Sequence, residues 1–224
     1  MKFFLILATA LFLPLIVLAQ PDPAIPDGEN LSVPESWKVR LDRPDPDVVI
    51  GAEVDSVDIF FVNMTSGWHI TTGPAAIFYH PEQMAEGDYT LESIIHLFDP
   101  GERREAYGIF MGGQNLEGDE IMYDYFLLRN SGEFLIKRRM GSETSIIQDW
   151  TASESVHMYG PESESSVENH LKVDVHNDTI TFSVNGTEVH NVPRNAAMTD
   201  GIVGLRINHA LNVHVSDLKV TPHQ

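Results

Sequence analysis

Residues 123–140, with the sequence YDYFLLRNSGEFLIKRRM, constrain the fold more than any other stretch of the chain. They predict a β-hairpin, because Gly132 can adopt the left-handed conformation that a three-residue turn at 130–132 needs. The turn fixes the register of the two strands. One face of the hairpin then carries apolar cross-strand pairs with an acid–base pair at their far end, namely Leu128/Phe134, Phe126/Ile136 and Asp124/Arg138.

The opposite face of the hairpin has a different chemistry. Its pairs are Tyr123/Arg139, Tyr125/Lys137, Arg129/Glu133 and one apolar pair, Leu127/Leu135. A slip of one residue would mix the two faces, so the register is strongly specified. The hairpin therefore predicts a sheet with one face in a core and the other lined by tyrosines and cations.

Alternating apolar and polar residues recur along most of the chain after residue 48, and no stretch there has a convincing helical pattern. Two-residue turns at 177–178 and 185–186 tolerate positive φ and close a three-stranded meander over 169–192. Its predicted core-facing residues are Leu171, Val173, Val175, Ile180, Phe182, Val184 and Val189. About a dozen short strands at this spacing indicate an all-β, two-sheet antiparallel jelly-roll sandwich with almost no helix.

The first 19 residues have the layout of a signal peptide, with Lys2, an apolar run and the small residue Ala19 at the expected cleavage point. A retained membrane anchor is the alternative. Residues 20–34 are rich in proline and predict a disordered lead, followed by a single domain over 35–222. We therefore expect a secreted or periplasmic protein without further stable membrane insertion.

Composition narrows the possible partners. The net charge of −19 argues against nucleic acid and anionic membrane surfaces, which select basic patches. The chain has no cysteine, so an exported domain of this size must rest on its core rather than on disulfides. Nothing in the sequence indicates the oligomeric state.

Several segments together resemble a known family. They are GWHITTGPAAI at 67–77, YGIFMGG at 107–113, the hairpin at 123–140, VNGTEV at 184–189 and GIVGLRINH at 201–209. They are similar to exported bacterial concanavalin A-like jelly rolls, close to laminin G-like modules and to domains named 3-keto-disaccharide hydrolase. The resemblance spans about residues 37–220 and implies the jelly-roll fold and a sugar-related role.

The sequence does not predict catalytic residues. Jelly-roll glycosidases commonly place two acids on one strand in the pattern Glu-x-Asp-x-x-Glu. The nearest string is EGDEIMYD at 117–124, which contains a glycine and has its last acid misplaced. The chain also lacks His-Glu-x-x-His, His-x-His and Gly-x-Ser-x-Gly motifs.

The family resemblance implies one metal ion rather than a cofactor. Jelly rolls of this type often hold a structural calcium on the convex side through carboxylates and backbone oxygens. Asp217 in the last predicted strand and Asp58 near the start, or Asp55 beside it, are the candidate ligands. The alternative is that Asp217 lies at a strand edge and is merely hydrated.

Carbohydrate recognition needs hydrogen-bonding side chains for hydroxyls and flat apolar surfaces for C–H faces. In the strand at 201–208, Val203, Leu205 and Ile207 should face the core, which leaves Arg206 and Asn208 on the other side. The candidate ligand-binding residues are Tyr123, Tyr125, Lys137, Arg139, Arg206, Asn208, Trp68 and His69. The alternative for this face is a solvated sheet with cation–π pairs.

These observations favour an exported, non-catalytic protein that binds a saccharide or glycoconjugate. A glycoside or keto-sugar hydrolase with acids from separate strands is the first alternative, and it requires carboxylates to converge in one cleft. A structural or partner-binding module of the cell envelope is the second alternative, and an exposed apolar patch would favour it.

Overall fold

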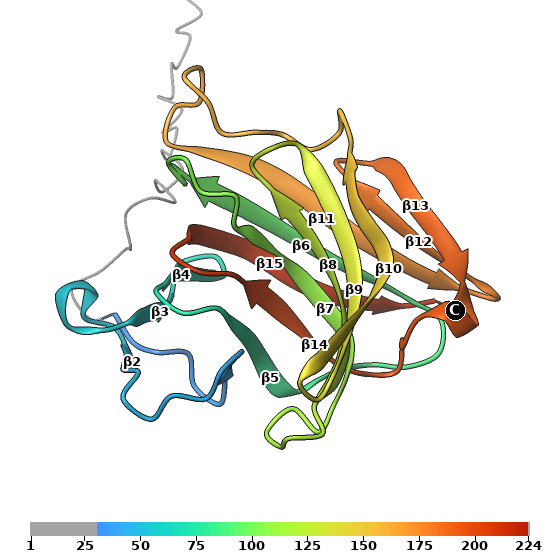
Figure 1. The fold of residues 1–224 in the computed structure, drawn as a ribbon, viewed down its shortest axis with the longest axis horizontal. Coiled ribbons are helices and arrows are strands. Elements are labelled where there is room, and N and C mark those ends of the chain that lie inside the picture. The colour runs from blue at the N-terminus through green and yellow to red at the C-terminus, as the bar shows by residue number, and fades with distance from the viewer. Residues whose placement is uncertain (1–30, 224) are drawn as a thin grey trace, which may run out of the picture.

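The structure, a computed structural model, describes residues 31–223 and forms a sandwich of two curved β-sheets (Figure 1). The predicted signal peptide and most of the proline-rich lead lie outside the described residues. At the end of that lead, Pro34 is buried and the backbone oxygen of Ser32 accepts a hydrogen bond from the Asn63 N–H at 3.1 Å. The chain therefore packs against the domain from about residue 32 onward.

Among the described residues, one sheet has seven strands in the order β1-β5-β14-β7-β8-β9-β10. Their bounds are β1 Lys38–Leu41, β5 Ala76–Ala85, β14 Gly201–Ile207, β7 Ala106–Gln114, β8 Met122–Arg129, β9 Glu133–Met140 and β10 Glu143–Ala152. All of its neighbouring strands are antiparallel.

The other sheet of the described chain has eight strands in the order β13-β12-β11-β6-β15-β4-β3-β2. Their bounds are β13 Thr187–Pro193, β12 Thr179–Val184, β11 Ser166–His176, β6 Tyr89–Phe98, β15 Asn212–Pro222, β4 Trp68–Thr72, β3 Ile59–Asn63 and β2 Ile50–Gly51. Two short 3₁₀ turns, Val54–Ser56 and Arg194–Ala196, are the helical segments described. No helix in this part of the chain is long and apolar enough to cross a membrane.

The core lies between the two sheets and is built from alternate residues of their strands. The seven-stranded sheet contributes, among others, Phe78, Ile109, Phe126, Ile136 and Leu205, all nearly inaccessible to solvent. Because side chains alternate between the faces of a strand, the residues between these must point to the outer face of the same sheet. The fold is therefore the predicted all-β jelly roll.

The hairpin register predicted for 123–140 is confirmed at each pair from Tyr123↔Arg139 to Arg129↔Glu133. Gly132 has φ 76°, as the turn requires. At the far end of the core-facing side, Asp124 is fully buried and accepts hydrogen bonds from Arg138 Nε and Nη2, both at 2.8 Å.

The meander is also confirmed, with the pairs Leu171↔Val184, Val173↔Phe182 and Val175↔Ile180. The residues Asn177 and Asn185 both have φ 51°. An irregularity after Phe182 in the β12–β13 ladder places Val189 outside the regular pairing, but this residue still packs against the core.

Candidate functional site

The outer face of the seven-stranded sheet is covered to a degree that the sequence did not predict. Its central side chains form a second apolar cluster that includes Tyr79, Phe110, Tyr123, Tyr125, Leu127 and Leu135. The β7–β8 loop, residues 115–121, folds across this cluster and adds Leu116 and Ile121 to it. The loop is fixed by a hydrogen bond from Gly141 N to Ile121 O at 2.7 Å and another from Arg40 Nη2 to Gly118 O at 3.3 Å.

A group of three charged residues lies beside this apolar cluster, and we call it the Asp42 cluster. Arg206 donates two hydrogen bonds to the Asp42 carboxylate, each at 2.7 Å. Arg139 donates to Oδ1 of the same carboxylate at 2.9 Å and to the Asp42 backbone oxygen at 3.0 Å. Bidentate arginine–carboxylate pairs of this kind are among the stronger and more directional polar contacts in proteins.

The Asp42 cluster shows that the outer face of this sheet is concave. Asp42 directly follows β1, whereas Arg139 lies on β9, five strands further along the sheet. Neighbouring strands are about 4.8 Å apart, so a flat sheet would separate these two positions by roughly 24 Å. Their direct contact requires the sheet to curl over its own outer face.

The two tyrosines of the hairpin support Arg206 from inside the cluster. The hydroxyl of Tyr123 accepts a hydrogen bond from Arg206 Nη1 at 3.1 Å, and the guanidinium carbon lies 4.9 Å from the centre of the Tyr125 ring. Tyr123 is 0% exposed and Tyr125 is 6% exposed. These rings therefore position the arginine rather than offer a stacking surface to a ligand.

The contacts within the Asp42 cluster stabilise the ionised forms of Asp42 and Arg206. Burial disfavours the charge of Asp42, but the hydrogen bonds and charges of Arg206, together with the charge of Arg139, hold its pKa below the usual value. Burial likewise opposes the charge of Arg206, and the contact with Asp42 outweighs it and raises the pKa of Arg206. Burial also raises the pKa of the Tyr125 hydroxyl. At neutral pH the cluster is thus an ionised carboxylate between two guanidinium groups, with the neutral hydroxyl of Tyr125 beside it.

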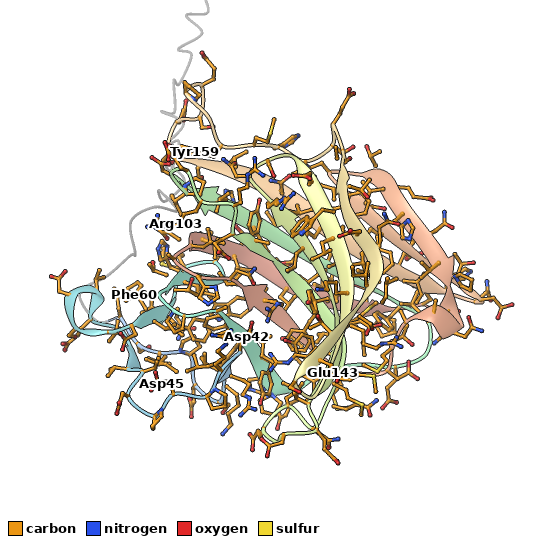
Figure 2. The ribbon with its side chains drawn as sticks, in the orientation of Figure 1. Asp42, Asp45, Phe60, Arg103, Glu143 and Tyr159 are labelled. Carbon is orange, nitrogen blue, oxygen red and sulfur yellow. The ribbon has the colours of Figure 1, made fainter. Side chains whose placement is uncertain are left out.

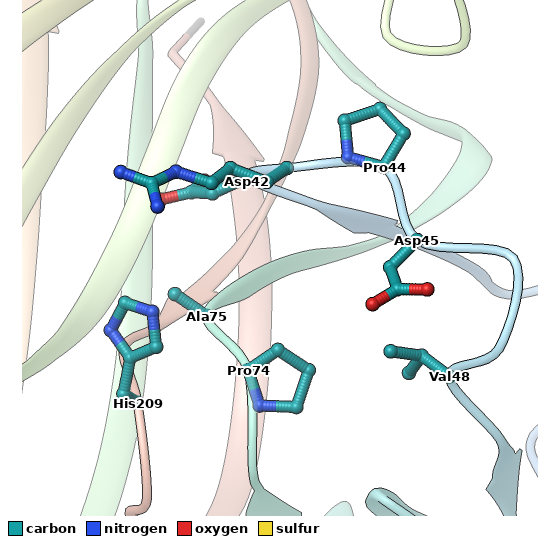
Figure 3. A pocket seen from close by; sticks show the side chains of 8 residues that line it. Asp42, Pro44, Asp45, Val48, Pro74, Ala75 and His209 are labelled. Carbon is teal, nitrogen blue, oxygen red and sulfur yellow. The ribbon is translucent and has the colours of Figure 1, made fainter.

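A cavity of about 370 Å³ opens next to the Asp42 cluster (Figure 3). Its lining residues are Asp42, Arg43, Pro44, Asp45, Val48, Pro74, Ala75 and His209. In the close-up, Asp45 and His209 face the opening from opposite sides, with Pro74 between them. Figure 2 shows Asp42 near the middle of the molecule and Asp45 farther out, toward the segment that contains β2. The cavity therefore lies at one end of the concave face, where the β1–β2 connection crosses it.

The Asp42 carboxylate retains capacity for a further hydrogen bond. An ionised carboxylate can accept about four hydrogen bonds, and Asp42 accepts three, from Arg206 Nη1, Arg206 Nη2 and Arg139 Nη1. Its side chain is 28% exposed. Asp45 and His209 add further polar atoms, while Pro44, Pro74 and Val48 supply apolar surface. The cavity is thus suited to a small molecule that carries hydroxyl groups.

The remaining candidate ligand-binding residues have three different locations. Lys137 lies on the concave face opposite Tyr125 and is half-buried. Asn208, just after β14, donates its backbone N–H to Ala106 O at 2.9 Å, and its side-chain oxygen is buried. Trp68 and His69 do not reach the concave face.

Trp68 points into the sandwich and packs on the core, with its ring 4.5 Å from that of Trp37. His69 is its neighbour on β4 and points to the outer face of the eight-stranded sheet, on the other side of the molecule. Alternation along one strand forces this separation, so the two residues cannot line one rim.

The acids predicted as calcium ligands are both exposed. Asp217 lies on β15, and Asp58 accepts a hydrogen bond from Val49 N at 2.8 Å through Oδ2. Among the described residues, neither belongs to a group of three acids and histidines close enough to hold one ion. Calcium at these positions stays a prediction.

The sequence reasoning did not select Asp42, Asp45 or His209 as binding residues. The alternation of Trp37, Val39 and Leu41 toward the core carried the signal for Asp42, because it places residue 42 on the outer side. No local pattern brings His209 to the β1–β2 connection. Their proximity depends on sheet order and curvature.

No protein-family model matches this sequence, and no curated protein matches it either. Solved structures match over most of the chain at low identity. A carbohydrate-binding module of Bacillus subtilis, described as CBM66, is 11% identical with a TM-score of 0.57, and the match covers 83% of this chain and 94% of that one. The β-glucanase of Bacillus licheniformis is 12% identical with a TM-score of 0.54, and the match covers 90% of this chain and 96% of that one.

A third similar structure, from Bacillus subtilis, is described as a protein of unknown function with a galectin-like fold. It is 12% identical with a TM-score of 0.53, and the match covers 82% of this chain and 88% of that one. At these identities the likeness establishes the fold. The described chain has the architecture of a concanavalin A-like jelly-roll domain.

Proposed function

We propose that this protein is an exported, non-catalytic saccharide-binding protein and that its ligand binds in the cavity beside Asp42. The observation that carries the proposal is the Asp42 carboxylate itself. Two guanidinium groups hold it in a fixed position, it accepts three of about four possible hydrogen bonds, and Asp42 lines the cavity. A fixed acceptor avoids the entropic cost of ordering a side chain when a hydroxyl binds.

The size of the cavity supports a small portion of a saccharide. Its volume of about 370 Å³ is at the lower end of the range of ~300–1,000 Å³ found for small-molecule sites. The proline rings at 44 and 74 offer C–H surface against a sugar ring, and Asp45 and His209 offer hydrogen bonds at its edge. One or a few sugar units fit this description better than an extended chain along the sheet.

Two of the similar structures are sugar-related by their descriptions, one a carbohydrate-binding module and the other a β-glucanase. The concave face of this chain supports binding rather than hydrolysis. A glycosidase needs a general acid, and such an acid has a raised pKa in a dry setting. Two carboxylates on this face, Asp42 and Glu133, both have lowered pKa values because of their arginine partners.

The other acids near the concave face are exposed to water or paired with a basic side chain. Glu105 is half-buried and lies 3.7 Å from Nδ1 of His209. Asp45 at the cavity edge is open to water, as are Glu117, Asp119 and Glu120 on the β7–β8 loop. Asp124 points to the core side, where Arg138 neutralises it. These positions support the non-catalytic part of the proposal.

The test is a glycan array with neutral and acidic saccharides, followed by calorimetric titration of the tightest hit. Asp45→Asn should weaken binding about tenfold, because a hydrogen bond to a charged group contributes ~1.5 kcal/mol. His209→Ala should weaken binding about fivefold, through the loss of one hydrogen bond that contributes ~1 kcal/mol. Asp47→Asn makes the same change of charge in the same loop but outside the cavity, so it should bind as the parent protein does.

Lys137→Ala tests whether the ligand binds in the cavity or elsewhere on the concave face, because Lys137 lies on that face outside the cavity. This variant should bind the saccharide almost as tightly as the parent protein does. Loss of binding with Lys137→Ala but not with Asp45→Asn would overturn the proposed position. Release of reducing sugar from any bound glycoside would overturn the non-catalytic assignment.

Export is tested by N-terminal sequencing of the protein recovered outside the cytoplasm, where a new terminus at Gln20 is expected.

A further inference from the structure

Three side chains converge at one end of the eight-stranded sheet, away from the cavity. The residues Val175 and Pro222 both pair with Tyr89, since β11 and β15 flank β6. His176 follows Val175, and His223 follows Pro222 directly after β15, whereas Asp88 precedes Tyr89. Because β11 and β15 both run antiparallel to β6, these three residues lie side by side across the strands. Figure 1 shows the end of the chain beside the turn that follows β11.

This row lies on the outer face of the sheet. Val175 and Tyr89 point into the core, and side chains alternate along a strand, so His176 and Asp88 point outward. The side chains are accessible, with 57% of His176, 30% of Asp88 and 25% of His223 exposed. The site is therefore open to an ion from solution.

The potential ligand atoms are at distances that suit one small cation. The two Nδ1 atoms of His176 and His223 are 3.0 Å apart, and His176 Nδ1 is 3.6 Å from Asp88 Oδ2. One ligand atom from each of the three residues falls within 4.8 Å of the others. A tetrahedral zinc ion with bonds near 2.0–2.1 Å has ligand atoms about 3.3 Å apart. Small rotations of the side chains would bring the observed distances of 3.0 and 3.6 Å to this value.

The hydrogen bonds at Nε2 of His223 keep its Nδ1 unprotonated, as a metal ligand requires. The hydroxyl of Thr90 donates its single proton to Asp174 Oδ1 at 2.7 Å. His223 Nε2, 2.9 Å from that hydroxyl, must then be the donor. The same Nε2 is 3.3 Å from Asp174 Oδ1. A neutral histidine protonated on Nε2 presents an unprotonated Nδ1, and a carboxylate behind the ring is a common feature of zinc-binding histidines.

Asp88 is also held in place. Its Oδ1 accepts a hydrogen bond from Arg194, and its Oδ2 accepts one from Asn177 N at 2.9 Å. These contacts turn Oδ2 toward His176 and leave it lone-pair capacity. Two imidazoles and one carboxylate oxygen are therefore arranged around one point before any ion binds.

We propose that His176 Nδ1, His223 Nδ1 and Asp88 Oδ2 bind a zinc ion, with water as the fourth ligand. Zinc favours imidazole and carboxylate ligands in tetrahedral geometry, whereas calcium prefers six to eight oxygen ligands. Without zinc, His176 Nδ1–H donates to His223 Nδ1. When the ion binds, this proton moves to Nε2 of the same ring, so that a neutral imidazole ligates through Nδ1. The ion then joins the end of β15 to the central strands β6 and β11.

The test uses the full chain without a histidine tag, titrated with zinc chloride in a calorimeter. We expect one ion per chain, a raised melting temperature that a chelator reverses, and no response to calcium. Cobalt should give the visible absorption of a tetrahedral complex. His176→Ala and His223→Ala should each weaken zinc binding at least tenfold, and Asp174→Asn about tenfold through loss of the support behind His223.

His80→Ala, on the seven-stranded sheet, is the matched control and should bind zinc as the parent protein does. His176 is largely exposed, so its replacement should leave the metal-free melting temperature nearly unchanged and separates loss of a ligand from unfolding. The proposal is overturned if the parent protein binds no zinc, or if the double variant His176→Ala/His223→Ala binds it with parental affinity.

Discussion

A row of three histidines on the eight-stranded sheet predicts a loss of stability in mild acid. His69, His214 and His96 lie opposite one another on the adjacent strands β4, β15 and β6. His214, at the centre, is only 4% exposed. Burial, followed by the charges of His96 and His69, lowers the pKa of His214 to about 4. The folded protein therefore keeps this ring neutral at a pH where the unfolded chain binds a proton.

The direction and size of the effect follow from this difference. An unfolded histidine titrates near 6.5, so stability from His214 is complete above that pH and is lost as the pH falls toward 4. Between pH 7 and pH 5 the loss amounts to about 2 kcal/mol for a folded pKa near 4.

The assay is urea unfolding of the parent protein and of His214→Gln at the two pH values. Glutamine does not titrate, so the variant should lose about 2 kcal/mol less than the parent protein between pH 7 and pH 5. All other titratable groups are present in both proteins. Their contributions to the pH-dependent free energy of unfolding therefore cancel in the comparison, apart from those of groups in contact with His214. His80→Gln serves as the control and should follow the parent protein. Equal losses for the parent and His214→Gln would refute the reasoning.

Two further predictions concern the packing of the sandwich. Arg138→Leu should cost ~3–5 kcal/mol in urea unfolding, because it removes the charged partner of the fully buried Asp124 carboxylate and leaves it the hydrogen bond from Met198 N. A loss below ~1 kcal/mol would show that this ion pair does not matter, whereas the double variant with Asp124→Leu should recover part of the loss. Gly108→Ala should lower the melting temperature strongly or prevent folding, because the added Cβ would lie 2.1 Å from Phe126 O. Gly160→Ala meets no atom within 4 Å and is the control, so equal melting temperatures for the two variants would contradict the structure.

The parts of the fold that depend on local rules were predictable from the sequence. The hairpin register followed from a single turn, and its faces followed from alternation, so Phe126 and Ile136 were correctly placed in the core. The same holds for Leu205 on β14. Turn chemistry and period-two patterning act over a few residues, which is why a single sequence reveals them.

The binding surface was harder to predict because it depends on contacts between distant segments. Tyr123 and Tyr125 were assigned correctly to the outer face, but the β7–β8 loop and Arg206 bury them there. Leu116 and Ile121 were the only sign that this acidic loop folds back. The contact of Asp42 with Arg139 needs the curvature of the whole sheet, which no local pattern encodes.

The residues of the proposed zinc site could not be predicted from the sequence either, because they are distant along the chain. His176 and His223 are 47 residues apart, and strand order alone brings their rings together beside Asp88. Histidine spacing along the chain therefore does not reveal this site.

The most direct test of the central proposal is a crystal structure of the protein soaked with the saccharide that binds most tightly on the array. We expect a sugar ring in the cavity between Asp45 and His209, with a hydroxyl within hydrogen-bonding distance of the Asp42 carboxylate. A ligand bound instead on the outer face of the eight-stranded sheet, or an empty cavity at saturating saccharide, would contradict it.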